Sequence, residues 1–243
     1  TGMLPGTLKG TKSIGWLIAE YGIAQVSMNI TNLGETPLHV AFDEVDEKAR
    51  ARGLRVTGLE IVGLVPKAAI MDAGRHYLRK QQRSLSVTDA ELIKIAVKSM
   101  GLDDLKPFVA DEKIIEYMLA AEGKKDSLVD MTCRGFADET ASESPAPGGG
   151  SISAYLGALG ASLATMVANL SAHQAGWDDR WEEFSEWAVK GQAIKDDLLA
   201  LVDEETDAFN RVMDAFGLPK TPDDEKSARA DAIQDATKFA TEV

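Results

Sequence analysis

A glycine-rich stretch at residues 144–151 has the residue types of a ligand-binding turn. It reads Ser-Pro-Ala-Pro-Gly-Gly-Gly-Ser, and an apolar segment over residues 152–170 follows directly. The prolines stop an incoming helix, the glycines permit unusual backbone conformations, and Ser151 is predicted as the N-cap of a new helix. Free N–H groups at such a helix start can hold an anionic or carbonyl-bearing ligand. We therefore expect a ligand site at Gly148, Gly149, Gly150 and Ser151, although a plain tight turn between packed helices explains the same residues.

A carboxylate on an apolar helix face is the second candidate for chemistry. Apolar residues recur at spacings of three and four along a predicted helix from about Asp178 to Phe216, and only Lys195 and Glu205 interrupt them. A carboxylate on a core-facing seam must be solvated by a cavity, paired or protonated, because an isolated buried charge is too costly. This predicts Glu205 as a general base with a raised pKa. The alternative is a Glu205 side chain that reaches an arginine or the solvent.

The histidines and the cysteine are weaker candidates. His39 falls on a predicted amphipathic helix, where a packed or surface histidine is expected. His76 lies in a basic patch, which can attract a polyanion but is more often only solvated. His173 follows the apolar segment and is predicted to line a pocket. Cys133 has no histidine near it in the sequence to activate the thiol, so a structural role is expected.

Composition narrows the class of protein. The 243 residues carry a formal charge of −13, which disfavours nucleic acid and anionic membrane surfaces as partners. A single cysteine excludes an internal disulfide, and the three histidines are too scattered for a zinc site, which predicts a cytoplasmic protein without a metal. The chain stops at Val243 inside a helical pattern, so we expect the last domain to be truncated at its C-terminus.

The elements that must position these residues change character along the chain. Residues 1–122 predict an α+β domain, a small α/β sandwich with helices on one face of a mainly antiparallel sheet. Its expected elements are strands at 14–19, 23–30 and 54–65 and helices at 36–53, 66–77, 88–100 and 111–121. Residues 123–127 are polar and predict a linker.

Residues 128–243 predict an all-α domain, an incomplete helical bundle. The apolar segment at 152–170 is almost long enough to span a bilayer, but it contains polar residues and lacks flanking basic residues or aromatic belts. We expect it to be the central buried helix of the bundle. An incomplete bundle leaves an apolar face open and predicts association with another chain.

Several sequence motifs resemble those of a known family. In the first part they are Leu8–Gly10, Ile14–Trp16, Ala24–Asn29, Val62–Pro66 and Ile114–Tyr117. In the second part they are Ser144–Ser151, Leu201–Phe209 and Leu218–Lys220. The first set is similar to the C-terminal subdomain of glutamate formiminotransferase, and the second to the cyclodeaminase (cyclohydrolase) family. Their order is that of the bifunctional formiminotransferase-cyclodeaminases.

The resemblance implies a tetrahydrofolate-dependent enzyme of histidine degradation. One half of such enzymes transfers a formimino group from formiminoglutamate to tetrahydrofolate. The other half closes 5-formiminotetrahydrofolate to 5,10-methenyltetrahydrofolate and releases ammonia. The implied co-substrate is tetrahydrofolate, expected in its polyglutamylated form, and a homo-oligomer is expected. The alternatives are a non-catalytic folate-binding or oligomerisation module, or a stand-alone methenyltetrahydrofolate cyclohydrolase.

The resemblance also assigns residues. The family's transferase histidine belongs to an N-terminal subdomain expected to lie outside this chain, so His39 does not inherit its role. The acid that the family uses as proton acceptor aligns with Glu205, although aspartate is common at this position. The glycine turn from Gly148 to Ser151, together with His173, is expected to contact folate.

Overall fold

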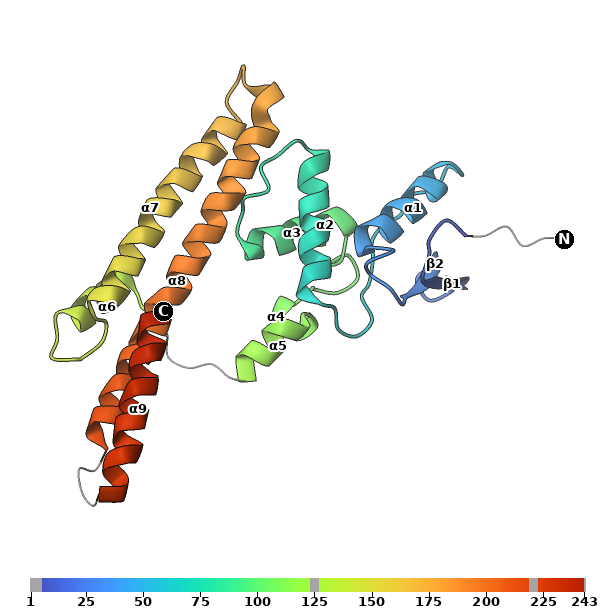
Figure 1. The fold of residues 1–243 in the computed structure, drawn as a ribbon. Coiled ribbons are helices and arrows are strands. Elements are labelled where there is room, and N and C mark those ends of the chain that lie inside the picture. The colour runs from blue at the N-terminus through green and yellow to red at the C-terminus, as the bar shows by residue number, and fades with distance from the viewer. Residues whose placement is uncertain (1–5, 123–126, 219–222, 243) are drawn as a thin grey trace. The chain divides into compact units, whose positions relative to one another are not determined.

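The structure is a computed structural model that describes residues 6–122, 127–218 and 223–242. Its contacts divide the chain into two compact units, residues 1–124 and 125–243. In the described ranges, both strands belong to the first unit and the second unit is helical (Figure 1). The predicted class, α+β followed by all-α, is therefore confirmed. Residues 123–126 of the predicted linker lie outside the described residues, so the linker stays a prediction.

The first unit opens with the predicted hairpin. Strands β1 (Thr11–Ile18) and β2 (Ile23–Ile30) are antiparallel, with Thr11 opposite Ile30 and Ile18 opposite Ile23. Apolar side chains stay exposed on both faces, since Ile14 is 66% and Leu17 69% exposed. The described helices therefore pack on one another rather than covering this hairpin as a sandwich would require.

Five helices follow the hairpin in the described part of the first unit. They are α1 (Leu38–Arg50), α2 (Lys67–Lys80), α3 (Asp89–Met100), α4 (Ala110–Lys113) and α5 (Ile115–Glu122). The core gathers Ile70, Leu92, Met100 and Ile114 from α2, α3 and the α4–α5 junction. Thr88 caps α3, because its side chain accepts a hydrogen bond from the Glu91 N–H.

The strand expected over residues 54–65 does not form. Gly63 has a φ of 85° and interrupts the extended backbone. The hydrogen bonds of this segment go elsewhere, from the Leu59 N–H to the Gly101 carbonyl and from the Val65 N–H to the Lys113 carbonyl. Val65 forms a single parallel bridge with Ile114, which is extended and buried. That bridge also splits the helix expected at 111–121 into α4 and α5.

The second unit is built around two long antiparallel helices, α7 (Gly149–Ala172) and α8 (Trp181–Gly217), which run side by side in Figure 1. The short η1 (Leu128–Asp130) and α6 (Cys133–Thr140) precede them, and η2 (Asp178–Arg180) lies at the turn between them. Helix α9 (Asp223–Glu242) returns along the end of α8. This arrangement brings the start of α7 beside the second half of α8.

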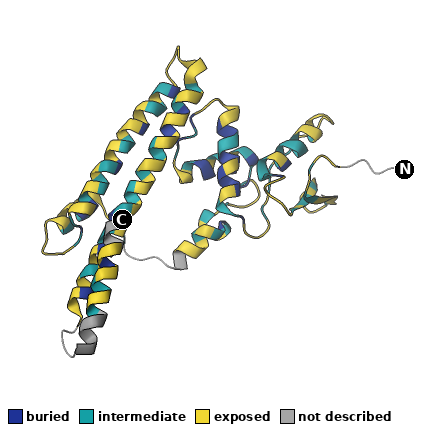
Figure 2. Ribbon diagram, viewed as in Figure 1, coloured by how far each residue is buried: buried dark blue, intermediate teal, exposed yellow. Residues whose placement is uncertain are grey.

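The prediction that residues 152–170 form a central buried helix is wrong for the described chain. Only 17% of the apolar window of α7 is buried, and α8 is the long helix that packs along it. Figure 2 shows exposed residues along much of its length. Leu156, Leu163 and Leu170 are among the exposed side chains. Within the described ranges, α7 is also the one helix long and apolar enough to cross a membrane, a test that core helices of soluble proteins pass too.

Candidate active site

Close contact between α7 and α8 fixes the register of the site. A Cβ atom added to Gly191 would lie 2.2 Å from Oγ1 of Thr165, and one added to Gly157 would lie 3.3 Å from a methyl group of Leu198. The two helix backbones therefore approach each other where small residues allow it. In this register, Glu205 of α8 lies against the first turn of α7.

The Glu205 carboxylate is held by Ser151. Its Oε2 atom accepts two hydrogen bonds, from the Ser151 hydroxyl at 2.7 Å and from the Ser151 N–H at 3.3 Å. A carboxylate at the N-terminus of a helix is favoured by the free N–H groups and the helix dipole. Glu205 is partly buried, so the alternative in which its side chain simply reaches an arginine or the solvent does not describe this contact.

Gly150 provides the space for this carboxylate. A Cβ atom at position 150 would lie 2.6 Å from both Cγ and Oε1 of Glu205 and 2.7 Å from its Cδ. At Gly148 the same construction places both carboxylate oxygens at 3.7 Å, whereas at Gly149 nothing lies within 4 Å. Thus two of the three glycines face Glu205, and Gly149 faces open space.

Ser151 is not the N-cap that its sequence position suggested. Gly148 is the N-cap residue, α7 begins at Gly149, and Ser151 is the third helical residue. Its side chain is fully buried, where it contacts the Val202 carbonyl and the Thr206 hydroxyl as well as Glu205. Thr206 was missed by sequence reasoning, although positions 202, 205 and 206 share one helix face by their spacing.

Two backbone N–H groups at the turn stay available to a ligand. Among the described residues, the N–H groups of Gly149 and Gly150 have no hydrogen-bond acceptor. Both residues are exposed. The helix start can therefore donate to a carbonyl or anionic group beside the Glu205 carboxylate.

The Asp203 side chain links two segments of the second unit and does not only face solvent. Its carboxylate accepts hydrogen bonds from the Ser127 hydroxyl at 2.5 Å and from the Leu128 N–H at 2.7 Å. These bonds attach the start of the second unit to α8. Asp207, in contrast, is exposed.

Cys133 lies beside the same end of α7. The thiol is exposed, so it is not a buried structural cysteine. It interacts with Tyr155, one turn beyond Ser151, and burial together with Cys133 raises the pKa of the Tyr155 hydroxyl. Tyr155 also packs against Phe136 of α6, with ring centroids 5.1 Å apart.

His173 does not join this site. Ser151 and His173 stand at opposite ends of α7, about 33 Å apart at a rise of about 1.5 Å per residue. His173 instead lines an open pocket of about 410 Å³ between α7 and α8, with neighbours that include Asn169, Gln192 and Lys195. Its predicted pocket is therefore present, but it is a different place from the Glu205 site.

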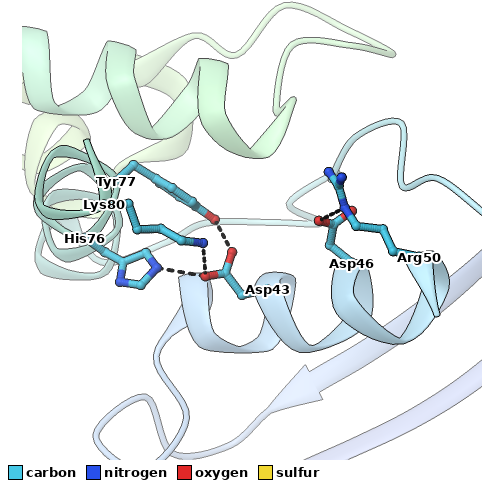
Figure 3. A network of polar contacts seen from close by, with 6 residues as sticks. All are labelled: Asp43, Asp46, Arg50, His76, Tyr77 and Lys80. Carbon is cyan, nitrogen blue, oxygen red and sulfur yellow. Dashed lines mark hydrogen bonds and ion pairs between the residues drawn. The ribbon is translucent and has the colours of Figure 1, made fainter. Parts of the chain in front are cut away.

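A separate polar cluster around Asp43 includes His76 (Figure 3). Asp43 accepts hydrogen bonds from Nε2 of His76 and Nζ of Lys80, both at 2.8 Å, and from the Tyr77 hydroxyl at 3.1 Å. Burial opposes ionisation of Asp43, but the bonds from Lys80 and His76 outweigh it and lower its pKa.

His39 stacks on His76 in this cluster, with ring centroids 4.3 Å apart. Burial, and then the neighbouring His76, lower the pKa of His39. His39 thus packs within the first unit, as its sequence position predicted. In the described ranges, no group of three His, Cys, Asp or Glu side chains could hold a metal ion, and the expectation of a metal-free enzyme stays a prediction.

Comparison with known proteins matches each half of the chain to a family model of its own. Residues 2–120 match the formiminotransferase domain, and residues 132–243 match the family described as formiminotransferase-cyclodeaminase. Formimidoyltransferase-cyclodeaminases of Mus musculus and Gallus gallus are 38% and 37% identical over 98% of this chain, which spans 44% of each. A methenyltetrahydrofolate cyclohydrolase of Methylorubrum extorquens is 39% identical over 46% of this chain and 54% of its own length. The chain spans less than half of the length of its bifunctional relatives, and its two parts match the formiminotransferase domain and the formiminotransferase-cyclodeaminase family in turn.

Proposed function

We propose that the second unit carries the cyclodeaminase chemistry of a bifunctional, tetrahydrofolate-dependent enzyme and that Glu205 is its general base. One observation carries this proposal. Glu205 presents a carboxylate at the glycine turn with Oε2 fixed by Ser151, while Oε1 has no hydrogen bond among the described residues and faces the turn. A base held in one orientation beside free N–H donors suits proton transfer from a bound substrate.

The proposed reaction closes 5-formiminotetrahydrofolate to 5,10-methenyltetrahydrofolate. N10 of the folate attacks the formimino carbon and forms the new C–N bond, and Glu205 takes the proton that N10 loses. The bond from this carbon to the formimino nitrogen then breaks, and the nitrogen leaves as ammonia after receiving a proton. The N–H groups of Gly149 and Gly150 would hold a carbonyl or anionic part of the folate near the base.

The first unit would contribute to formimino transfer from formiminoglutamate to tetrahydrofolate. This part of the proposal is supported by the formiminotransferase match over residues 2–120. The described residues of this unit supply the Asp43 cluster, whose carboxylate is already shared by three donors. We therefore assign no catalytic residue of the transferase to this cluster. Cytoplasmic location, homo-oligomeric assembly and a polyglutamylated co-substrate complete the proposal.

The test is Glu205→Gln in the full-length enzyme. Glutamine keeps the shape of the side chain but cannot accept the proton, so methenyltetrahydrofolate formation should fall by about 10²–10⁴. Absorbance of methenyltetrahydrofolate and release of ammonia report the reaction. Formimino transfer, measured separately, should stay near the parent rate because the match for that activity lies in the other unit. A cyclodeaminase rate within about twofold of the parent would remove Glu205 as the base.

A stand-alone cyclohydrolase activity is the second candidate. The similarity to the methenyltetrahydrofolate cyclohydrolase of Methylorubrum extorquens, confined to 46% of this chain, favours it. In this reaction, Glu205 would take a proton from the water that attacks the methenyl carbon. The two activities are separated by substrate, because cyclodeamination releases ammonia from the formimino compound and hydrolysis of methenyltetrahydrofolate does not.

A further inference from the structure

We infer that Ser151 is not a folate-binding residue but a positioning residue that, with Thr206, orients the Glu205 carboxylate. This inference rests on the proposed role of Glu205. Ser151 has 0% exposed surface, so its hydroxyl is closed to any ligand that approaches the turn. Every contact of that hydroxyl goes to α8.

The Ser151 hydroxyl has more possible partners than protons, and this decides which of them accepts its hydrogen bond. Its oxygen lies within hydrogen-bond distance of Oε2 of Glu205 at 2.7 Å, the Val202 carbonyl at 2.9 Å and Oγ1 of Thr206 at 3.1 Å. A hydroxyl has a single proton to donate and can accept at its lone pairs. The charged oxygen is the nearest and strongest acceptor, so the proton is directed to Glu205.

Thr206 completes this arrangement. When Ser151 donates to Glu205, the Ser151 oxygen can accept a hydrogen bond from the Thr206 hydroxyl. The result is a chain of donors from Thr206 to Ser151 to Oε2 of Glu205, in which each hydrogen bond polarises the next. Glu205 and Thr206 are adjacent on α8, so one turn of this helix supplies both ends of the chain.

The two bonds from Ser151 end on the same oxygen. The N–H and the hydroxyl of Ser151 both donate to Oε2, and no described hydrogen bond reaches Oε1. Two donors at one oxygen fix the rotation of the carboxylate about its terminal bond, which is otherwise soft. Oε1, on the Gly150 side, is therefore the oxygen that would accept the proton in the reaction.

The experiment compares Ser151→Ala with Ser153→Ala in the full-length enzyme. Ser153 is the matched control, because it lies on the same helix but its exposed hydroxyl bonds to the Gly149 carbonyl and not to Glu205. Ser151→Ala should lower kcat by about tenfold or more as the carboxylate loses its orientation. The folate KM should stay within about twofold, and Ser153→Ala should match the parent in both measurements.

Two further variants separate this inference from the proposed function. Adding Ser151→Ala to Glu205→Gln should lower the rate little further, since a residue that acts through the Glu205 carboxylate then has no carboxylate left to orient. Thr206→Val should show a weaker form of the Ser151→Ala loss of kcat, because the single Ser151 proton is then less firmly directed to Glu205 and can turn to the Val202 carbonyl instead.

The outcomes are distinguishable. If Glu205→Gln stays active, the proposed function fails and the positioning role fails with it. If Glu205→Gln is inactive but Ser151→Ala raises the folate KM and leaves kcat unchanged, Ser151 binds folate and this inference alone fails. The inference is also overturned if the two serine variants give the same kcat.

Discussion

Gly150→Ala tests the geometry of the site without removing any polar group. The added Cβ would lie 2.6 Å from Cγ and Oε1 of Glu205, about 1 Å inside ordinary carbon contact distance. The glutamate must rotate away and lose both hydrogen bonds to Ser151. Alanine in place of glycine favours a helix by up to about 1 kcal/mol, whereas overpacking costs about 1–3 kcal/mol and a hydrogen bond to a charged group is worth about 1.5–3 kcal/mol. We expect a net destabilisation of about 1–2 kcal/mol, since water replaces part of the lost bonding.

Gly160→Ala is the control for this prediction. Gly160 lies on the same helix, and a Cβ there meets nothing within 4 Å, so this variant should be neutral or slightly stabilised and fully active. Gly150→Ala should reduce methenyltetrahydrofolate formation by at least about 100-fold, close to the loss of a general base. Chemical denaturation and the absorbance assay measure the two effects. If Gly150→Ala has the same stability and the same rate as Gly160→Ala, the carboxylate does not need the space at Gly150 and the described site is wrong.

Two further predictions concern packing and pH. Gly191→Ala should destabilise the second unit by about 1–3 kcal/mol in chemical denaturation, because its Cβ would lie 2.2 Å from Oγ1 of Thr165. Adding Thr165→Ala should restore part of this loss, and an undisturbed Gly191→Ala would contradict the close helix contact. His39 has a lowered pKa in the folded state, mainly through burial, so protonation favours unfolding and stability should fall as pH drops below about 6.5, the ordinary value for histidine. His39→Phe should reduce the change in melting temperature between pH 7 and pH 5, and an unchanged pH dependence would show that His39 does not contribute. Asp43, whose pKa is also lowered, loses its contribution to stability only below about pH 3.8.

Local sequence signals predicted the helices more successfully than the sheet. The Thr88 cap, the Pro66 start and the three-four spacing of α8 are properties of neighbouring residues, and the structure contains each corresponding helix. The strand expected at 54–65 depended instead on which partner accepts its hydrogen bonds. Those partners are Gly101 and Lys113, far along the chain, and no pattern within the segment indicates them. The same reason explains why Ile114 interrupts a helix that its local sequence favours.

Burial was overestimated for α7 because an apolar segment shows what a helix can bury, not what covers it. Leu156 and Leu163 are 62% and 61% exposed in the described unit although their residue types suit a core. His173 was expected to contact folate together with the glycine turn for a related reason. The sequence shows that both lie at the ends of one helix, but only the straight length of α7 shows how far apart these ends are.

The sequence predicted the residues of the site but not how they contact one another. Sequence reasoning treated the glycine turn as a cradle for a ligand and Glu205 as a base on a distant helix, two features joined only by family resemblance. The structure joins them physically, since the missing Cβ of Gly150 is what admits the Glu205 carboxylate to the helix start. The helix N-terminus therefore acts first on the protein's own carboxylate, through the Ser151 N–H, and leaves the N–H groups of Gly149 and Gly150 for the substrate. A base and its adjoining donors are then held by one turn of α7, and any shift of α8 that moves Glu205 also changes its hydrogen bonds to that turn.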